Sequence, residues 1–379
     1  MGRIEVEIGA PGADIAAHWE RLAACAAVNV FMSPAALAAA CATKFAKVHV
    51  LRAWDRSAGD RQLVGLWAFE ERGIAPLWPA FLAAPPYDYA FVSTPVIDPA
   101  VMDDVVAAFF DAIEHSPALP NVIRLKFLDG DSAAYHAMLG ALSRRASQTL
   151  TLSERQRPFL TGESEMKRSG STRKKLRQDW NRLSALGATD VVNDRTSSAV
   201  HDAFEVFLTL EAESWKGAQG TALLNDAKDA TFARRLIGDL AAQGNASVAL
   251  LRVDGRPIAA QVLLYCGTMA YTWKTAFDAD YAKYSPGALL VDKVTEDLFA
   301  AHRIEAIESC SPEKSFMAQL WSGRRATVDL LIDVGARRSL NFALAAAAER
   351  SYAQLKDWRD RLRAIPWLKP KKPGLVASR

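Results

Sequence analysis

The segment from Ser247 to Leu290 constrains the fold more than any other part of this 379-residue sequence. SVALLRVDGRPIAAQVLLY contains two strand-like runs joined by Asp254-Gly255, a strong hairpin signal, and Met269 to Ala276 supplies a third strand. The chain then passes through Tyr284-Ser285-Pro286-Gly287-Ala288 into a helix-like segment. A strand, a glycine-bearing turn and a helix start aim free backbone N–H groups and the helix dipole at one spot. The sequence therefore predicts a meander that ends in a phosphate-binding cradle.

The elements around this meander occur in an order that the first half of the chain repeats more faintly. In the second half, the patterns predict helices over 201–214, 227–243, 287–301 and 312–321 and strands over 303–308 and 326–333. In the first half, they predict strands over 47–54 and 62–69, an extended stretch near 89–93, a helix over 101–115, a strand over 122–128 and a helix over 131–144. We therefore expect two copies of one α/β unit, each with a mixed sheet.

The length of the chain suits two domains, since one domain typically takes about 100 to 200 residues. We place the first domain at residues 1–155 and the second at 156–338. Residues 339–379 form a third region, with an amphipathic helix from Leu340 to Arg363 and a loose Lys/Pro tail from Pro366 to Pro373.

Composition excludes several classes of protein. Forty-six basic against 43 acidic residues give a net charge of +3, too slight to indicate DNA binding. The four cysteines and six histidines lack metal-ligand or catalytic-triad spacing, so we expect no metal. There is no secretory signal and no run of about 20 apolar residues, so we expect a soluble, cytoplasmic protein without a membrane span.

A basic segment connects the two halves. Seven Lys and Arg residues between Lys167 and Arg182 alternate with Leu176, Trp180 and Leu183 at helical spacing. This pattern fits either a solvated helix face or a site for an anionic substrate, which Arg173 and Arg177 would contact.

Five short motifs in order resemble the GNAT-type acyltransferases. They are Leu210-Glu211-Ala212-Glu213-Ser214-Trp215-Lys216-Gly217, Gly220-Thr221-Ala222-Leu223, Lys274-Thr275-Ala276-Phe277-Asp278, Tyr284-Ser285-Pro286-Gly287 and Glu308-Ser309-Cys310. Within that superfamily the chain is similar to the BioF2-like or CelD-like acetyltransferase group, related in architecture to the FemAB aminoacyltransferases. The resemblance covers Lys167 to Asp333, and the first half only by topology.

The resemblance implies two tandem GNAT-like domains, of which the second is catalytic and the first is not. It implies transfer of an acyl group, as in an acetyltransferase, from acyl-CoA (acetyl-CoA) to an amine by direct attack in a ternary complex. The phosphate loop departs from the usual family pattern, because Lys283 stands first, Pro286 replaces a glycine and Ala288 stands last. Pro286 also removes one N–H donor.

The reaction needs a base for the amine and stabilisation of an oxyanion. We assign the base to Glu211, which ends a predicted helix four residues before Trp215, and whose pKa we expect to rise beside that aromatic wall. Glu213 and Asp278 are alternatives. Asp278 would also orient Tyr281 or Tyr284, and by resemblance either of these tyrosines would donate a hydrogen bond to the leaving thiolate.

The remaining predicted site residues bind the two substrates. The donor would contact Lys274, Ser285, Pro286, Gly287, Ala288 and Leu289. Trp215, Lys216, Arg173 and Arg177 would contact the acceptor, a small-molecule or glycan/lipid-precursor amine.

Two other functions stay open. A FemAB-like transferase would take its group from aminoacyl-tRNA, with the basic segment on the RNA. A catalytically inactive GNAT-fold protein in polysaccharide or envelope assembly would keep the fold without turnover.

Overall fold

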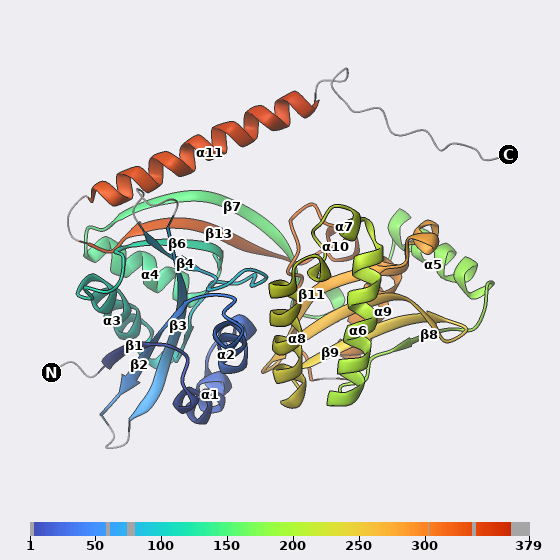
Figure 1. Ribbon diagram of the computed structural model, residues 1–379, viewed down its shortest axis with the longest axis horizontal. Helices are drawn as coiled ribbons and strands as arrows, with labels where there is room; N and C mark the ends of the chain where they lie inside the picture. The colour runs from blue at the N-terminus through green and yellow to red at the C-terminus, as the bar shows by residue number, and fades with distance from the viewer. Residues whose placement is uncertain (1–3, 58–60, 74–79, 302, 336–338, 365–379) are drawn as a thin grey trace.

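A computed structural model describes residues 4–57, 61–73, 80–301, 303–335 and 339–364 (Figure 1). The tail predicted from Pro366 to Pro373 lies outside the described residues.

The first half forms β1 (Ile4–Gly9), α1 (Ala13–Cys25), α2 (Pro34–Ala42), β2 (Val48–Asp55), β3 (Gln62–Arg72), β4 (Phe81–Ala84), β5 (Val96–Ile97), α3 (Met102–Glu114), β6 (Val122–Asp129), α4 (Ala133–Arg144) and β7 (Gln148–Leu160). The second half forms α5 (Ser171–Ser184), β8 (Thr189–Val192), α6 (Ser197–Glu213), α7 (Trp215–Ala218), α8 (Ala227–Ala242), β9 (Ala246–Val253), β10 (Arg256–Cys266), β11 (Met269–Phe277), α9 (Pro286–Ala300), β12 (Ala306–Glu308), α10 (Met317–Leu320) and β13 (Arg324–Asp333). The last helix is α11 (Leu340–Ala364). The mixed α/β class predicted from the sequence is confirmed.

The predicted meander is present as β9, β10 and β11, paired antiparallel in sequence order. Asp254 and Gly255 between β9 and β10 have φ of 48° and 79°, the positive values that a tight hairpin turn requires. One first-half prediction is wrong: the stretch near Tyr89 to Ser93 is a loop, and the strand at this point is β4, upstream of Pro85-Pro86. Proline has no N–H for a ladder, so strand pairing ends before this pair.

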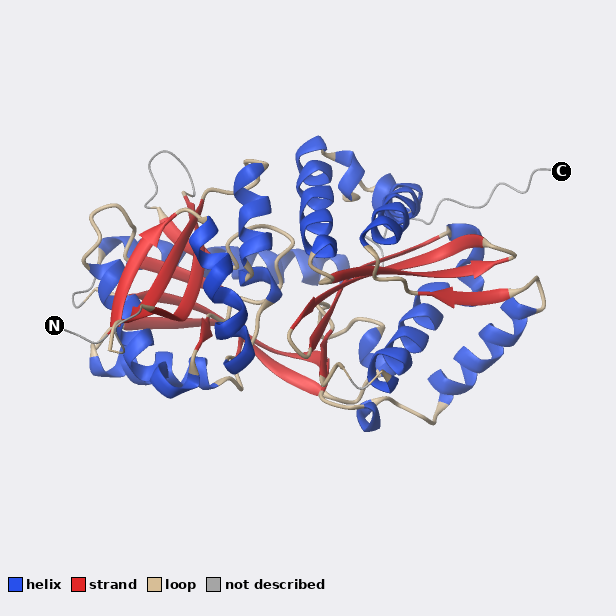
Figure 2. Ribbon diagram, turned by 90° about the horizontal axis from the view of Figure 1, so that it is seen from below, coloured by secondary structure: helices blue, strands red, loops and turns tan. Residues whose placement is uncertain are grey.

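All strands except β5 lie in one continuous order, β1-β2-β3-β4-β6-β13-β7-β12-β11-β10-β9-β8. Strand β7 joins the two halves, because residues up to Pro158 pair with β13 while Phe159 and Leu160 pair with β12 (Figure 2). Strand β13 belongs to the second half in the sequence but inserts between β6 and β7 of the first. The halves are therefore linked through shared strands as well as through packing.

The largest hydrophobic core takes side chains from both halves. Phe45 and Phe232 stack with their ring centroids 4.1 Å apart, and the Tyr271 hydroxyl donates to the Val28 carbonyl at 3.0 Å. A second core lies within the second half, between α5, α9 and the sheet. The site described next is held between these two cores.

Helix α11 lies along β7 and β13 (Figure 1). Its first half packs Phe342, Ala345 and Ala346 on apolar side chains of β4, β6 and β13, and Glu349 pairs with Arg124 at 2.8 Å. No helix in the described part of the chain combines the length and apolarity that a bilayer crossing requires.

Candidate active site

A cavity of about 800 Å³ opens beside β11. Its walls come from α5, α7, β11, the turn before α9, the segment from Ser311 to Leu320 and Phe91 of the first half. It exists because β11 and β12 pair only from Met269 to Tyr271, after which the sheet separates and Thr272 to Thr275 face the gap. The cavity exposes the edge of a strand whose backbone can bind an extended ligand.

The structure brings six of the predicted site residues together at this cavity: Trp215, Lys216, Lys274, Ser285, Gly287 and Ala288. Seven others do not line it: Glu211, Asp278, Tyr284, Pro286, Leu289, Arg173 and Arg177. The first group includes Lys216, Lys274 and residues of the turn before α9. The sequence therefore predicted residues that line the cavity more successfully than residues that lie behind its wall.

The turn before α9 is the predicted cradle. Ser285 adopts a left-handed conformation with φ of 53°, and Pro286 begins the helix. The amides of Ser285, Ala288 and Leu289 are bonded within the turn, and Pro286 has none. Among the five residues from Ser285 to Leu289, the Gly287 N–H is thus the amide left for a ligand, together with the positive end of the helix dipole.

Lys175 on α5 places a positive charge beside this turn. Its Nζ lies 2.6 Å from Ser285 Oγ and also pairs with Asp179. The side chain is 58% exposed and lines the cavity with its neighbour Thr172. We did not single out Lys175 from the basic segment, because helical spacing alone does not show which residue faces the cradle.

Glu211 lies behind the cavity wall, fully buried at the end of α6. Its Oε1 accepts from Lys216 Nζ at 3.1 Å and from Lys274 Nζ at 3.2 Å, and its Oε2 accepts from the Leu223 N–H at 3.0 Å. Lys216 Nζ also donates to the Thr275 carbonyl at 3.1 Å. One carboxylate therefore holds two cationic side chains against the cavity.

These contacts reverse the expected shift of the Glu211 pKa. Burial acts to raise it, but the charges of Lys274 and Lys216 and the Leu223 N–H together outweigh burial, so the pKa of Glu211 is lowered. The predicted rise is wrong because Glu211 faces two ammonium groups and not only an aromatic wall. The pKa of Lys274 is also lowered, by burial and by the nearby Lys216 charge, against the opposing effect of Glu211.

Aromatic rings surround Lys274. Its Nζ lies 4.7 Å from the ring centroid of Tyr89, a first-half residue, and 5.9 Å from that of Trp273. Trp273 Nε1 donates to the Tyr89 carbonyl at 2.8 Å. Trp215 stands at the cavity wall with 57% of its surface exposed. The first half thus contributes directly to the environment of Lys274.

Two of the predicted residues outside the cavity support its surroundings. Asp278 accepts from Arg256 at 2.8 Å and from the Asp280 N–H at 3.0 Å at the start of a short turn. Tyr284 is buried in the second core, with Arg182 and Lys283 over its ring. Its place one residue before Ser285 lets it anchor the turn.

The predicted substrate-binding arginines lie on the other side of α5. Arg173 pairs with Asp292 and, at 2.8 Å, with Glu296, both on α9. Arg177 and Leu289 line a separate cavity of about 190 Å³. The basic segment is therefore partly a contact between helices, and its remaining charges face outward.

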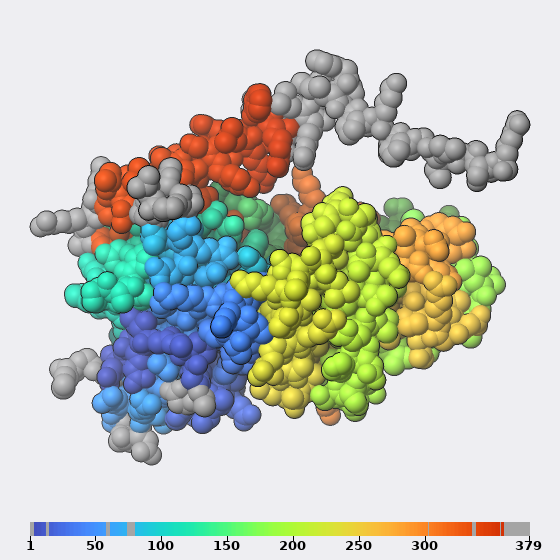
Figure 3. All heavy atoms as spheres, viewed as in Figure 1, coloured from blue at the N-terminus to red at the C-terminus, as the bar shows by residue number. Residues whose placement is uncertain are grey.

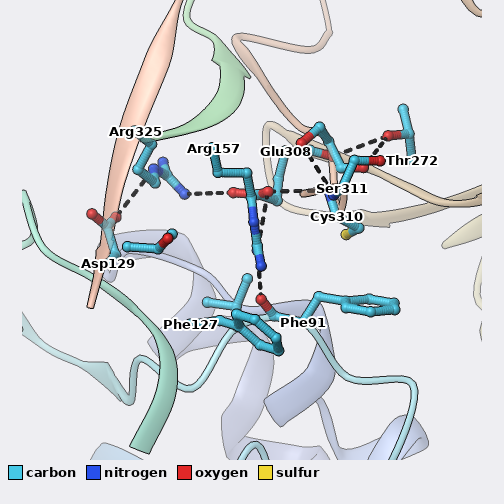
Figure 4. Close-up of polar contacts among 12 residues, drawn as sticks. Phe91, Phe127, Asp129, Arg157, Thr272, Glu308, Cys310, Ser311 and Arg325 are labelled. Carbon is cyan, nitrogen blue, oxygen red and sulfur yellow. Dashed lines mark hydrogen bonds and ion pairs between the residues drawn. The ribbon is translucent and has the colours of Figure 1, made fainter. Parts of the chain in front are cut away.

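A further cavity of about 280 Å³ lies between the halves and shares Phe91, Ser311 and Pro312 with the large one. On its wall, buried Arg157 donates to the Phe91 carbonyl at 2.7 Å and to Glu308 Oε1 at 3.3 Å (Figure 4). The sequence patterns do not predict this chamber, because Arg157 lies on β7, a strand that those patterns do not indicate.

The described residues contain no group of three or more His, Cys, Asp or Glu side chains arranged to hold a metal ion. Cys310, two residues after β12, is buried, and burial raises its thiol pKa well above the ordinary value. A protonated, enclosed thiol is a poor nucleophile.

Comparison with known proteins relates this geometry to a family. Residues 170–311 match the profile of the family described as "Acetyltransferase (GNAT) domain". No curated protein matches the sequence.

Three solved structures share the fold. FemX has a TM-score of 0.61 at 10% identity, with 90% of this chain and 100% of that chain covered. A conserved protein of unknown function from Bacteroides thetaiotaomicron has a TM-score of 0.52 at 12% identity, covering 86% and 100%. A C-terminal domain ascribed to a lysylphosphatidylglycerol synthetase of Agrobacterium fabrum has a TM-score of 0.50 at 15% identity, covering 75% and 84%.

Proposed function

This chain belongs to the GNAT superfamily, with a FemAB-related architecture, and we propose that it is a cytoplasmic enzyme that transfers an acyl group from acyl-CoA to an amine. The coarse activity, N-acyl transfer, follows from the family. The donor, the acceptor and the roles of individual residues are our proposal.

The observation that supports the donor best is the arrangement of Lys175, Ser285 and Gly287 at one end of the open edge of β11. The helix dipole, one free amide and one ammonium group suit a pyrophosphate. The separated strand edge from Thr272 to Thr275 suits the amide groups of a pantetheine arm that extends from it. The thioester would then lie near Lys274.

Lys274 would act on the reacting carbonyl. Its ammonium group would stabilise the oxyanion that forms when the amine attacks, and the surrounding rings keep water away and strengthen this interaction. We propose that Glu211 takes up the acceptor's proton. Because Lys274 stands between Glu211 and the cavity, the Lys274 ammonium group would pass one of its protons to Glu211 and take up the acceptor's proton in its place, which leaves Lys274 charged and Glu211 protonated.

The acceptor would enter through the cavity between the halves. That chamber meets the large cavity at Phe91, Ser311 and Pro312, so an amine there approaches the carbonyl from the side opposite the cradle. Arg155 pairs with Asp329 at 3.1 Å but keeps 39% of its side chain exposed on the wall of this chamber, so an acidic group of the acceptor could share it. An amino acid, an amino sugar phosphate or a glycan precursor would satisfy these contacts.

Calorimetry with acetyl-CoA and longer acyl-CoAs tests the donor site through Gly287→Asp. An Asp at this position favours the helix dipole but repels a pyrophosphate, so affinity should fall at least about a hundredfold while the fold survives. Gly287→Ala is the matched control, because a Cβ there would meet Phe277 and Thr275 at ordinary distances of 3.4 and 3.5 Å. If Gly287→Asp binds acyl-CoA as the wild type does, the pyrophosphate lies elsewhere. Silent titrations with every acyl-CoA would reject this donor.

The second candidate donor is aminoacyl-tRNA. Lys174 and Arg177 are exposed on α5, which gives an RNA a basic surface beside the cradle. Filter binding at low salt distinguishes the two, because phosphate contacts weaken steeply as salt rises. Absence of tRNA retention at low salt would leave acyl-CoA as the donor.

A further inference from the structure

Helix α11 carries two apolar faces, and only one of them meets the protein. The inward face contains Phe342, Ala345 and Ala346, which pack on the sheet of the first half. A second set of large apolar side chains is exposed: Leu340, Leu344, Tyr352, Leu355 and Trp358. At roughly 100° per residue, these five positions fall within an arc of about 120°, turned away from the inward face.

The exposure of this stripe is large. Tyr352, Leu355 and Trp358 keep 65%, 64% and 63% of their surface, and Leu340 keeps 74%. By comparison, the exposed leucines Leu139, Leu186 and Leu224 stand singly in other parts of the chain, with 38%, 50% and 40% of their surface exposed. Figure 3 shows α11, in red-orange, along the outer edge of the molecule. An apolar stripe of this extent indicates a partner surface.

The charge of this region identifies the partner. Residues 340–379 hold nine Lys and Arg against three Asp and Glu, so this segment carries +6 in a chain whose total is +3. The remaining 339 residues therefore carry −3. A second copy of the chain would bring one +6 segment against another, whereas an anionic bilayer attracts both the basic residues and the apolar stripe.

The residue types agree with this partner. Trp and Tyr prefer the boundary between headgroups and hydrocarbon, and a helix with an apolar stripe flanked by basic residues lies flat in that boundary. Arg350, Lys356 and Arg359 are exposed on α11. We propose that the outer face of α11 binds anionic phospholipid membranes and holds the enzyme at their surface. Because Lys356 also lines the cavity between the halves, the bilayer would lie close to that cavity.

Vesicle flotation of the full chain tests the proposal, using phosphatidylcholine vesicles with and without phosphatidylglycerol. Phosphatidylglycerol should raise the bound fraction, and added salt should lower it. The triple variant Tyr352→Ser/Leu355→Ser/Trp358→Ser should lose at least about tenfold in partition coefficient. Leu186→Ser, on an exposed leucine outside α11, should bind as the wild type does.

Three results would overturn the proposal. The first is the absence of binding to phosphatidylglycerol vesicles, and the second is equal binding by the wild type and the triple variant. The third is a wild-type dimer that the triple variant converts to a monomer in light scattering, because the stripe would then join two copies. Neither result bears on acyl-CoA binding, which calorimetry measures separately.

Discussion

At the residue scale, Glu211 shows how strongly a local environment decides the state of a carboxylate. A buried carboxylate without partners becomes harder to ionise, but Glu211 has two ammonium groups and one amide as partners. It therefore stays ionised at neutral pH, and its first task is to hold Lys216 and Lys274 at the cavity wall.

Glu211→Gln should lower the free energy of unfolding by about 3–5 kcal/mol at neutral pH, because two lysines lose their buried counter-charge. The folded-state pKa of Glu211 lies below the ordinary 4.5, so its contribution is complete above that pH and is lost as pH falls through the lowered pKa. The gap between the variant and the wild type should thus narrow below about pH 4.5. Urea denaturation at several pH values measures this difference in the free energy of unfolding. Glu213→Gln, on the exposed neighbour, should change stability by less than about 0.5 kcal/mol.

The parts of the site that could be predicted from the sequence are those in which functional side chains lie next to a recognisable turn motif. The Asp254-Gly255 hairpin and the Ser285-Pro286-Gly287 turn are short-range features, and both lie as expected. Lys175 and Arg157 could not be found this way, because each reaches the site through a contact distant in the sequence. The local motif also could not show that Lys274 separates Glu211 from the cavity.

At the element scale, β7 and β13 depart furthest from what the sequence indicates. Along residues 148–158 of β7, exposed side chains alternate with partly buried ones, because only one face of this part of the strand is covered. Many of these side chains are polar, so the sequence pattern that would indicate a strand is weak here. Strand β13 was predicted, but its partners were not, because hydrophobic periodicity does not encode which strands pair. The domain boundaries at residues 155 and 338 therefore stay a prediction from the sequence. The strands of the two proposed domains pair with each other across the first boundary.

Ile332→Ala in β13 should destabilise the first half although Ile332 belongs to the second half in the sequence. Ile332 is fully buried and pairs with Ile123 of β6 and Thr149 of β7, so the cavity should cost about 2–5 kcal/mol. Hydrogen exchange should show the earliest loss of protection in β6 and β7. Ile307→Ala in β12 is the matched control, and in this variant the loss of protection against hydrogen exchange should begin in β11 and β12. Earliest loss in β8 and β9 for Ile332→Ala would contradict the shared sheet.

At the scale of the whole molecule, one buried carboxylate lies where the two halves meet. Glu308 on β12 accepts from Arg157 on β7, lies 3.5 Å from Arg325 on β13, and accepts from the Cys310 N–H at 3.0 Å (Figure 4). Arg325 also pairs with Asp129 of β6 at 3.3 Å. Because these elements line the proposed acceptor chamber, the network that joins the halves also shapes a site that belongs to neither half alone.

Glu308→Gln should therefore weaken the whole molecule, by about 3–5 kcal/mol, because Arg157 loses a buried partner and Arg325 one of its two. Asp239→Asn removes a partner from an exposed pair with Arg235, and it should cost at most about 1 kcal/mol.

A double-mutant cycle of Glu308→Gln with Arg157→Met should give a coupling of about 0.5–3 kcal/mol, since removing both charges leaves fewer groups unpaired. Urea denaturation followed by tryptophan fluorescence measures all four proteins. Additive costs in the cycle would show that Glu308 and Arg157 act independently, and the junction would then depend on the shared strands and the apolar core.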